Sequence, residues 1–394
     1  MKKRILFLIH TLGVGGAEKV LINLANNMDK SKYDITIMTV IDTGIFKESI
    51  DYDIHYKTIF KIPFKKFKNS NTSSGSLHSN FNNSKLLLKK LYQFFWRHIN
   101  TKLIYKIFIK EYYDYEVAFL EGVATKIIAS SPHEKSKKYA WIHVDLINEK
   151  KSEHFYKSIN SQIKDYTKFN KIICVSDVVK KQAEKKLGLE KNKFMTLYNP
   201  IDTSEIITKS NQEIITKNNV ITFCSIGRLA KQKGYDRLIN VSNKLKNEGF
   251  NFSINILGEG PDKNQLEQLI EDYNLEDYVH LLGFHSNPYP YIKNCDVFIC
   301  PSRAEGFSTV ASEAVVLNKA CLVTNCSGMS ELFGEESEYG YIVSNDEKGI
   351  YEGMKLFLTN INLCEFYSQK SKENSIRFNL KNTIESIQER LFNE

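Results

Sequence analysis

Two carboxylates and the expected start of a helix fall within the short segment 301–314, PSRAEGFSTVASEA. An apolar strand is expected just before this segment, and the helix is expected to begin at Ser308 or Thr309. A helix start offers free backbone N–H groups and a partial positive charge, which suit a diphosphate. Glu305 would lie just outside the helix, within reach of a sugar hydroxyl, and Glu313 on its second turn could accept both ribose hydroxyls. The pattern favours a site for a nucleotide-linked sugar over a pair of solvated glutamates.

A second loop has residues that could do chemistry. It is GRLAKQKG at residues 227–234, and it follows the apolar run VITFCSIG. Arg228 and Lys233 lie five residues apart in it, and Lys231 between them is expected to be a solvated surface charge. Arginine can hold a diphosphate through two donors, and lysine supplies a compact charge. Together they could stabilise a leaving diphosphate without a metal. Gly283 ends another predicted strand, where its backbone could meet the edge of a base.

Glycines also follow the first predicted strand, in the loop GVGGAE at residues 13–18. The loop lacks the G-x-G-x-x-G spacing, and no acidic residue clearly ends the second strand, which argues against NAD binding. Gly15 and Gly16 at a helix start permit close backbone approach to a phosphate or a sugar. A tight strand–helix turn that binds no ligand is the alternative.

The elements that must position these loops are short apolar strands that alternate with helical periodicity, which predicts parallel, doubly wound α/β sheets. Strands are predicted at Ile5–Ile9, Ile35–Val40, Glu116–Leu120, Tyr139–Ile142, Ile172–Val175, Phe194–Leu197, in the run that begins at Val220, and at Phe252–Leu257, Val279–Leu282, Val297–Cys300 and Cys321–Thr324. Ser176 is the expected N-cap of a helix that runs to Leu187. The polar segment 203–219 is interpreted as an interdomain linker, and residues 382–392 as a final amphipathic helix. Ligands of such sheets bind beyond the carboxyl ends of the strands, where the loops above are expected.

The composition is that of an ordinary globular protein, since 394 residues favour two domains and the hydrophobic share is 42%. The seven cysteines show no disulfide or zinc spacing, so reduced thiols and a cytosolic protein are expected. The apolar run Ile5–Ile9 is too short for a signal peptide, and no stretch has the length needed to span a bilayer. Asp51-Tyr52-Asp53 imitates a metal-binding DxD motif but is interpreted as a surface turn.

The net charge of +8 is unevenly distributed, because residues 54–110 contain twelve Lys or Arg and no Asp or Glu. A polar stretch within this region, 69–84, is interpreted as a loop. The amphipathic run after it, LLLKKLYQFFWRHINTKLIYKIFIK, mixes Leu, aromatic residues and Ile with basic residues, which favours an interfacial helix on an anionic membrane. A helix packed on the core with a solvated basic side, or a nucleic-acid patch, are the alternatives. No nucleic-acid-binding motif accompanies the charge, so no nucleic-acid partner is expected.

The chain contains, in this order, the segments GGAE, GRLAKQKG, LGEGP, LLGF, EGFSTVASE and CSGMSEL. Together they resemble the motifs of the retaining glycosyltransferases of family 4. The matches run from about residue 5 to residue 345, which is most of the chain. The resemblance implies the GT-B fold, with two doubly wound Rossmann-like domains that face each other across a cleft. It places the acceptor mainly in an N-terminal domain, 1–203, and the nucleotide-sugar mainly in a C-terminal domain, 204–375. Residues 376–394 would form a C-terminal helix that crosses back to the N-terminal domain.

The same resemblance implies a set of site residues. Those assigned to catalysis are Arg228 and Lys233 on the diphosphate, Glu305 near the donor sugar and His143 of WIHVD beside that sugar. Those assigned to donor binding are Gly15, Gly16, Phe307, Ser308, Thr309, Glu313, Gly283 and Asn199. Two departures stand out: the family often has Asn-Gly where this chain has Asn199-Pro200, and the basic region 61–110 has no sharp family motif. That region falls where related enzymes often meet the membrane or the acceptor.

The sequence therefore predicts an enzyme, a retaining hexosyl- or N-acetylhexosaminyltransferase that uses a UDP-sugar and needs no metal or other cofactor. The expected acceptor is a lipid-linked saccharide in bacterial capsule, exopolysaccharide, O-antigen or glycan synthesis. The expected location is cytoplasmic, peripheral on the inner face of the cell membrane. A GT-B nucleotide-sugar 2-epimerase and a non-enzymatic basic membrane-binding adaptor are the alternatives.

Overall fold

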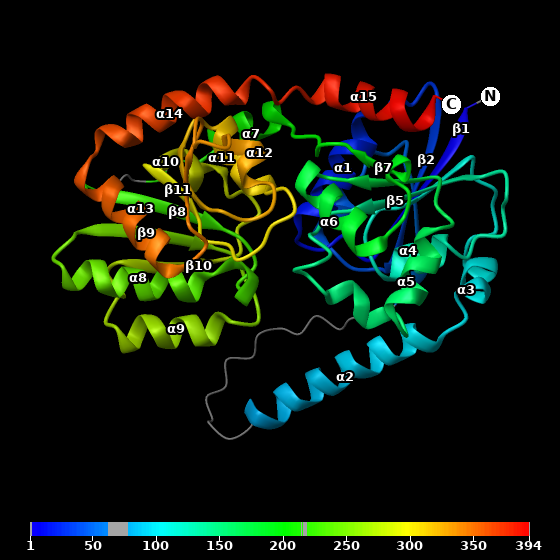
Figure 1. The fold of residues 1–394 in the computed structure, drawn as a ribbon, viewed down its shortest axis with the longest axis horizontal. Coiled ribbons are helices and arrows are strands. Elements are labelled where there is room, and N and C mark those ends of the chain that lie inside the picture. The colour runs from blue at the N-terminus through cyan, green and yellow to red at the C-terminus, as the bar shows by residue number, and fades with distance from the viewer. Residues whose placement is uncertain (1, 62–77, 214, 216–218, 394) are drawn as a thin grey trace. The chain divides into compact units, whose positions relative to one another are not determined.

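The computed structural model describes residues 2–61, 78–213, 215 and 219–393 (Figure 1). The chain divides into two compact units, each built around its own parallel sheet. The first unit contains Met1–Cys174 and Lys180–Thr196, and the second contains Val175–Val179 and Leu197–Glu394. The α/β, doubly wound character predicted from the sequence is confirmed in both units. The domain bounds at residues 203, 204 and 376 stay predictions.

The first unit is organised by a seven-stranded sheet in the order β3-β2-β1-β4-β5-β6-β7, in which all neighbours are parallel. Its strands are β1 (Lys3–Ile9), β2 (Tyr33–Ile41), β3 (His55–Phe60), β4 (Tyr115–Ala118), β5 (Lys137–Ile142), β6 (Lys171–Cys174) and β7 (Phe194–Thr196). The central strand β1 is apolar on both faces, and Ile5 to Ile9 are all fully buried. Continuous apolar strands are typical of parallel sheets that are covered on both sides.

The helices of the first unit connect these strands in sequence order. They are α1 (Gly16–Asn27), α2 (His78–His98), α3 (Thr101–Phe108), α4 (Val123–Ile128), α5 (Ile159–Tyr166) and α6 (Asp177–Leu187), with short 3₁₀ turns at Ile45–Ser49, Lys151–Phe155 and Lys191–Lys193. The first residues of α6 belong to the second unit. The Ser176 hydroxyl oxygen accepts the backbone N–H of Val179 at 3.1 Å, which confirms the predicted N-cap.

The basic region gives a mixed result. Its amphipathic run is helical, as predicted, and forms the carboxyl-terminal part of α2 and then α3. The predicted loop 69–84 is wrong for residues 78–84, which are the first turns of α2. Residues 69–77 lie outside the described residues. Polar residues such as Asn and Ser are poor helix formers, so composition alone concealed the start of this helix.

The second unit is organised by a six-stranded parallel sheet in the order β10-β9-β8-β11-β12-β13. Its strands are β8 (Ile221–Ile226), β9 (Phe252–Leu257), β10 (Val279–Gly283), β11 (Val297–Cys300), β12 (Ala320–Thr324) and β13 (Tyr341–Val343). The order reverses between β8 and β11, which makes the carboxyl ends of these two strands a topological switch point.

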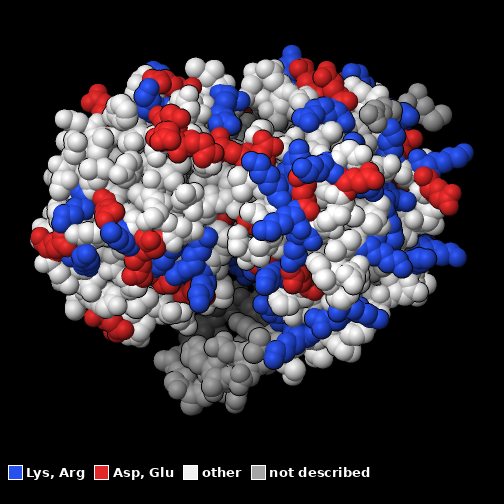
Figure 2. Space-filling view, in the orientation of Figure 1, with Lys and Arg blue, Asp and Glu red and all other residues white. Residues whose placement is uncertain are grey.

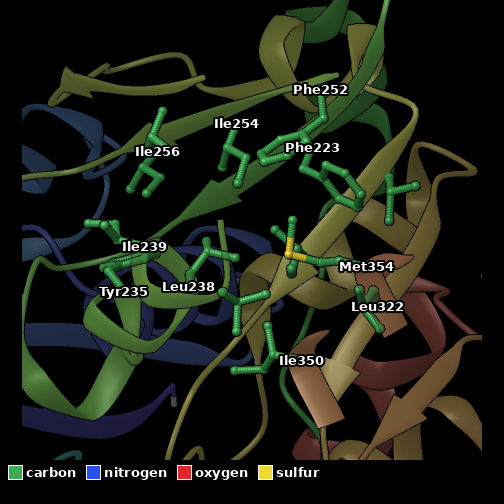
Figure 3. Packing of buried hydrophobic residues seen from close by; sticks show 14 of the residues in the cluster. Phe223, Tyr235, Leu238, Ile239, Phe252, Ile254, Ile256, Leu322, Ile350 and Met354 are labelled. Carbon is green, nitrogen blue, oxygen red and sulfur yellow. The ribbon is translucent and has the colours of Figure 1, made fainter. Parts of the chain in front are cut away.

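Helices cover both faces of this second sheet (Figure 1). The helices of the second unit are α7 (Thr203–Ser210), α8 (Tyr235–Asn247), α9 (Lys263–Asp272), α10 (Tyr289–Asn294), α11 (Thr309–Val316), α12 (Met329–Phe333), α13 (Glu347–Thr359), α14 (Asn362–Ser375) and α15 (Leu380–Phe392), with a 3₁₀ turn at Lys231–Lys233. In Figure 3, Phe223 and Ile254 of the strands pack near Leu238 of α8 and Met354 of α13. All four are fully buried, so this core fixes the strand ends that carry the loops described below.

The interpretation of residues 203–219 as a linker is wrong for its first half, because Thr203–Ser210 forms α7 within the second unit. The Asp202 carboxylate caps this helix by accepting the backbone N–H of Glu205 at 2.9 Å. Only Ile206 and Ser210 of α7 are buried, so the helix shows little apolar periodicity in the sequence. Residues 214 and 216–218 of the segment lie outside the described residues.

Other sequence-based expectations can be compared with the described residues directly. All seven cysteines are free, and five of them are buried. Asp51-Tyr52-Asp53 lies in an exposed turn, as predicted. Across the described ranges, no His, Cys, Asp and Glu side chains gather as three or more potential metal ligands. Within the same ranges, no helix combines the length and the apolar character that crossing a membrane requires.

Candidate functional site

The candidate site is formed by loops at the carboxyl ends of the second sheet, and backbone hydrogen bonds hold these loops together. The N–H of Gly227 after β8 donates to the carbonyl of Leu257 at 3.0 Å, and that of Gly258 donates to Gly283 at 2.8 Å. Gly258 has a φ of +147°, and a Cβ there would lie 2.0 Å from the Gly227 carbonyl oxygen. Only glycine permits so close an approach, so the LGEGP motif is required by packing between loops.

Lys233 and Glu305 meet as a shielded ion pair between two of these loops. Lys233 Nζ lies 2.6 Å from Glu305 Oε1, and the two side chains are 20% and 9% exposed. The Ser302 hydroxyl donates to the same carboxylate oxygen at 2.6 Å. Burial lowers the pKa of Lys233, but the Glu305 carboxylate overcomes this effect and the net shift is upward. The lysine is therefore held as an ammonium ion at the switch point of the sheet.

Two arginines that sequence reasoning missed brace the loops that carry this pair. Arg303 makes a two-pronged contact with Asp236, at 2.6 and 2.7 Å, and also donates to the carbonyl of Lys231 at 2.8 Å. Arg237 donates to the carbonyl of Pro301 at 2.7 Å and to Asn345. Bidentate guanidinium contacts restrict geometry, so these residues fix Lys233 relative to Glu305. In the sequence, Arg303 lies inside the motif at 301–314, and Arg237 lies three residues beyond the motif at 227–234.

The start of α11 has the geometry expected of it. Ser308 is the N-cap, and its hydroxyl oxygen accepts the Ala311 N–H at 3.4 Å, while Thr309 is the first helical residue. Phe307, just before the cap, is buried and lies 5.5 Å from the ring of Tyr198. Glu313 lies on the second turn, is 5% exposed, and accepts the Tyr289 hydroxyl at 3.3 Å. An N-capped helix start thus follows Glu305 directly.

The remaining predicted residues of the second unit take different positions. Arg228 is exposed on the loop that also carries Lys233. Gly283 ends β10 with a φ of +75°, and its carbonyl is occupied by the Gly258 N–H. Asn199 is buried, and its Oδ1 atom has no hydrogen-bond partner among the described residues. No hydrogen bond or ion pair among the described residues joins Asn199 to Lys233 or Glu305. The close group of the second unit is Lys233, Glu305 and the start of α11.

The other three predicted residues belong to the first unit. Gly15 is the N-cap residue of α1, and Gly16 is its first residue. A Cβ on Gly15 would meet the Glu18 carboxylate at 2.2 Å, so the Glu18 side chain covers this turn. His143 follows β5 and is half-buried, and its Nε2 atom is buried without a hydrogen-bond partner among the described residues. Burial lowers the pKa of His143 to about 3, so its ring is neutral near pH 7.

Two further residues at the carboxyl ends of the first sheet were not predicted. Glu121 follows β4 and contacts the backbone of His143. His10 follows β1, and its Nε2 lies 3.3 Å from the Tyr92 hydroxyl of α2. Burial lowers the pKa of His10 to about 4. His10 directly follows β1, and Glu121 directly follows the strand predicted at Glu116–Leu120. That position was the available signal in the sequence.

Residues 206–374 match the model of the family described as "Glycosyl transferases group 1". The matched region lies in the second unit and contains Arg228, Lys233, Glu305 and Glu313. This part of the chain is therefore similar to glycosyltransferase group 1 domains.

Two curated relatives extend this result. The N-acetylgalactosamine-N,N'-diacetylbacillosaminyl-diphospho-undecaprenol 4-alpha-N-acetylgalactosaminyltransferase of Campylobacter jejuni is 37% identical over 193 residues, which cover 48% of this chain and 51% of the relative. The chain thus spans about half the length of that enzyme. An uncharacterized glycosyltransferase of Haemophilus influenzae is 23% identical over 387 residues, 98% of each chain. The findings support a glycosyltransferase family and the predicted enzyme class.

Solved structures establish the fold. TarM of S. aureus superposes with a TM-score of 0.74 over 100% of both chains at 16% identity. HepE of Anabaena, in a complex with UDP and glucose, superposes with a TM-score of 0.73 over 99% of both chains at 19% identity. At such low identity these likenesses concern the fold alone. The chain has the GT-B fold, with two Rossmann-like units, as the sequence predicted.

Proposed function

We propose that this chain is a retaining glycosyltransferase of family 4 that moves a sugar from a UDP-sugar to a lipid-linked saccharide. The observation that carries the proposal is the Lys233–Glu305 pair, held 2.6 Å apart beside the capped start of α11 at the switch point of the second sheet. This is where ligands of doubly wound sheets bind. The group 1 match over residues 206–374 supports the same assignment.

In this proposal Lys233, Arg228 and the backbone N–H groups at the start of α11 accept the charge of the leaving diphosphate. Glu305 takes a hydroxyl of the donor sugar, and Glu313 takes the ribose hydroxyls. His143, Gly15 and Gly16 contribute from the first unit. The reaction needs no metal ion, because side-chain and backbone donors carry the charge that a metal would carry. The donor sugar is a hexose or an N-acetylhexosamine.

The names of relatives support the acceptor and the nucleotide of this proposal. Two Campylobacter jejuni relatives are named as transferring N-acetylgalactosamine to saccharides on diphospho-undecaprenol. A relative from Escherichia coli is named as a putative colanic acid biosynthesis glycosyltransferase. The TarM and HepE complexes contain UDP. By analogy, the acceptor is a saccharide on a polyprenyl diphosphate, and the product serves a bacterial surface polysaccharide or glycan.

A peripheral location on the inner membrane face forms part of the proposal. Trp96 and Tyr105 are fully buried and anchor α2 and α3 to the first unit. The outward side chains of these helices are apolar and basic. The exposed apolar residues are Leu87, Leu88, Leu91, Phe94, Phe95, Leu103 and Ile107, and the exposed lysines are Lys89, Lys90, Lys102, Lys106 and Lys110. Figure 2 shows how strongly Lys and Arg gather over the first unit. An anionic lipid surface would cover both kinds of side chain.

The experiment is a transfer assay with a panel of UDP-hexoses and UDP-N-acetylhexosamines, with and without polyprenyl-diphosphate saccharides. We expect acceptor-dependent release of UDP, an α-configured product from an α-configured donor, and no loss of rate with EDTA. The Lys233→Ala variant should be slower by about a hundredfold. Release of UDP without an acceptor, together with an epimerised sugar, would identify an epimerase instead. Absence of turnover and of nucleotide binding would favour an adaptor.

A further inference from the structure

The carboxylate of Glu121 contacts the backbone at His143. It lies three residues beyond the end of β4, and His143 lies one residue beyond the end of β5. The two strands are parallel neighbours, with Ala118 opposite Ala140. This register brings the two loops side by side, and Glu121 Oε1 accepts the backbone N–H groups of His143 and, at 3.1 Å, of Val144.

One carboxylate oxygen therefore binds two consecutive N–H groups, which is an arrangement that fixes a short turn. The loop of Glu121 is itself well held. Gly122 has a φ of +90°, and a Cβ there would lie 2.8 Å from the Phe155 ring. The segment after Val144 is fixed separately, because Asp145 accepts the N–H groups of Ile147 and Asn148 at 2.9 and 3.2 Å. Glu121 fixes the backbone at His143 and Val144, which lies before that segment.

The imidazole of His143 is ordered by its neighbours but keeps one atom available. The ring centroid lies 5.0 Å from that of Phe119 and 6.4 Å from that of Trp141. A backbone hydrogen bond to Phe119 involves the ring, while Nε2 is buried without a partner among the described residues. An unpaired polar atom costs free energy when it is buried, which favours a ligand that completes it. A neutral ring bonded to a carbonyl through one nitrogen offers a lone pair on the other.

We propose that Glu121 is a positioning residue, which fixes the His143–Val144 turn so that Nε2 of a neutral His143 can accept a hydrogen bond from a ligand hydroxyl. The identity of that ligand as the donor sugar rests on the proposed function. The positioning of His143 by Glu121 is a property of the protein without a ligand. Glu121 acts through the backbone and touches no substrate.

The test compares two conservative variants that separate reach from charge. Glu121→Gln keeps the length and an acceptor oxygen, whereas Glu121→Asp keeps the charge but is one methylene shorter and cannot serve both N–H groups as Glu121 does. Glu149→Gln is the matched control, since Glu149 lies near the same carboxylate but accepts from Lys151. The readouts are the ¹⁵N signals of the His143 ring in the ligand-free protein and kcat/KM for the UDP-sugar.

We expect Glu121→Gln to keep the His143 ring signals and stay within about threefold of the wild-type kcat/KM. Glu121→Asp should move those signals and lower kcat/KM about tenfold or more, as losses of supporting contacts do around other sites. The control should match the wild type in both readouts. Unchanged ring signals in Glu121→Asp would overturn the positioning role. Moved ring signals with no turnover of any UDP-sugar, in the wild type as well, would retain the positioning role and reject the proposed function.

Discussion

At the scale of single residues, the most consequential contact is the ion pair between Lys233 and Glu305. The lysine that should bind a diphosphate already has an anionic partner 2.6 Å away. A diphosphate would have to share or displace that partner. Removing one member of a shielded pair leaves the other uncompensated, and an added anion can then restore the balance. The pair would therefore lower the affinity for a nucleotide diphosphate while it holds the lysine in place.

Competition between Glu305 and a diphosphate for Lys233 predicts opposite effects of Glu305→Gln on binding and on turnover. We expect the affinity for UDP to rise about tenfold, which is about 1.4 kcal/mol, because Lys233 loses its competing carboxylate. Turnover should fall about a hundredfold, since the contact with the sugar is lost. Calorimetry and steady-state rates measure the two effects. Glu259→Gln, which breaks the exposed pair with Lys263, is the control and should change neither. Weaker UDP binding in Glu305→Gln would contradict the competition.

Glu121 makes a second residue-scale prediction, on the pH dependence of stability. Burial raises the pKa of Glu121 to about 7, and the charge of Glu149 adds to the rise. The hydrogen bonds from the backbone N–H groups of His143 and Val144 lower this pKa and offset part of the rise. Tyr166 is the other titratable neighbour that interacts with this carboxylate. The folded state thus holds a proton that the unfolded state releases between about pH 4.5 and 7. Stability should fall as pH rises through this window.

The Glu121→Gln variant removes this titration. In urea unfolding at a series of pH values, the free energy of unfolding of the variant should rise relative to that of the wild type between pH 4.5 and 7, by at most about 3 kcal/mol. That value is an upper bound because Glu121 keeps some exposure. A constant difference between the two proteins across the window would show that Glu121 titrates normally. Glu149→Gln again provides the matched comparison.

At the scale of elements, α2 and α3 present an outward surface that is both apolar and basic. We expect Lys89→Glu combined with Lys90→Glu to release the protein from anionic vesicles, since each charge near such a surface contributes about 1 kcal/mol. Arg97 is a poorer choice because it donates to the His154 carbonyl. Lys348→Glu combined with Lys381→Glu, at positions 80% and 82% exposed in the second unit, is the charge-matched control. Co-sedimentation at low and high salt measures binding.

Equal sedimentation of the α2 variant and the wild type at low salt would reject the membrane surface. Release of both double variants alike would mean that only net charge matters. We expect only the α2 variant to lose binding to the vesicles. Its transfer rate should fall more with a lipid-linked acceptor than with a short soluble one.

Elements also show where the sequence was informative. Strands buried on both faces, such as β1 and β11, contain continuous apolar runs and were predicted to within two residues. The edge strand β13 was missed, because it has only three residues and two of them are half-exposed. Helix α7 was missed for a similar reason, since it buries little apolar surface. Lys233 and Glu305 were predicted from their loops, but their direct contact was not, because a salt bridge between distant loops has no local signature.

At the scale of the whole molecule, charge is distributed unevenly between regions. The twelve basic residues at 54–110 exceed the net charge of +8, so the rest of the chain has a net charge of −4. Such an asymmetry orients a protein at an anionic surface without any specific contact. It also makes association with that surface depend on ionic strength.

The free thiols supply a prediction for the whole molecule. Five cysteines are buried, and Cys326 and Cys364 are partly exposed. Burial raises the pKa of the Cys300 thiol to about 11 and also raises that of Cys321, which keeps both unreactive in the folded protein. We expect an aromatic disulfide reagent to label at most two thiols in the native protein and all seven after unfolding. Rapid native labelling of more than two would contradict the packing of these sheets.

The interlocking of the loops in the second unit constrains how the protein could be redesigned. A Cβ on Gly258 or on Gly260 would lie about 2 Å from a carbonyl of the neighbouring loop, and one on Gly234 would lie equally close to the Pro301 carbonyl. Loop insertions or bulkier residues at these positions would therefore disturb several segments together. Under the proposed function, laboratory evolution toward a different donor sugar should succeed sooner with libraries that vary projecting side chains such as Phe284, at constant loop length. Recombination of single loops from other glycosyltransferases should yield mostly unfolded proteins.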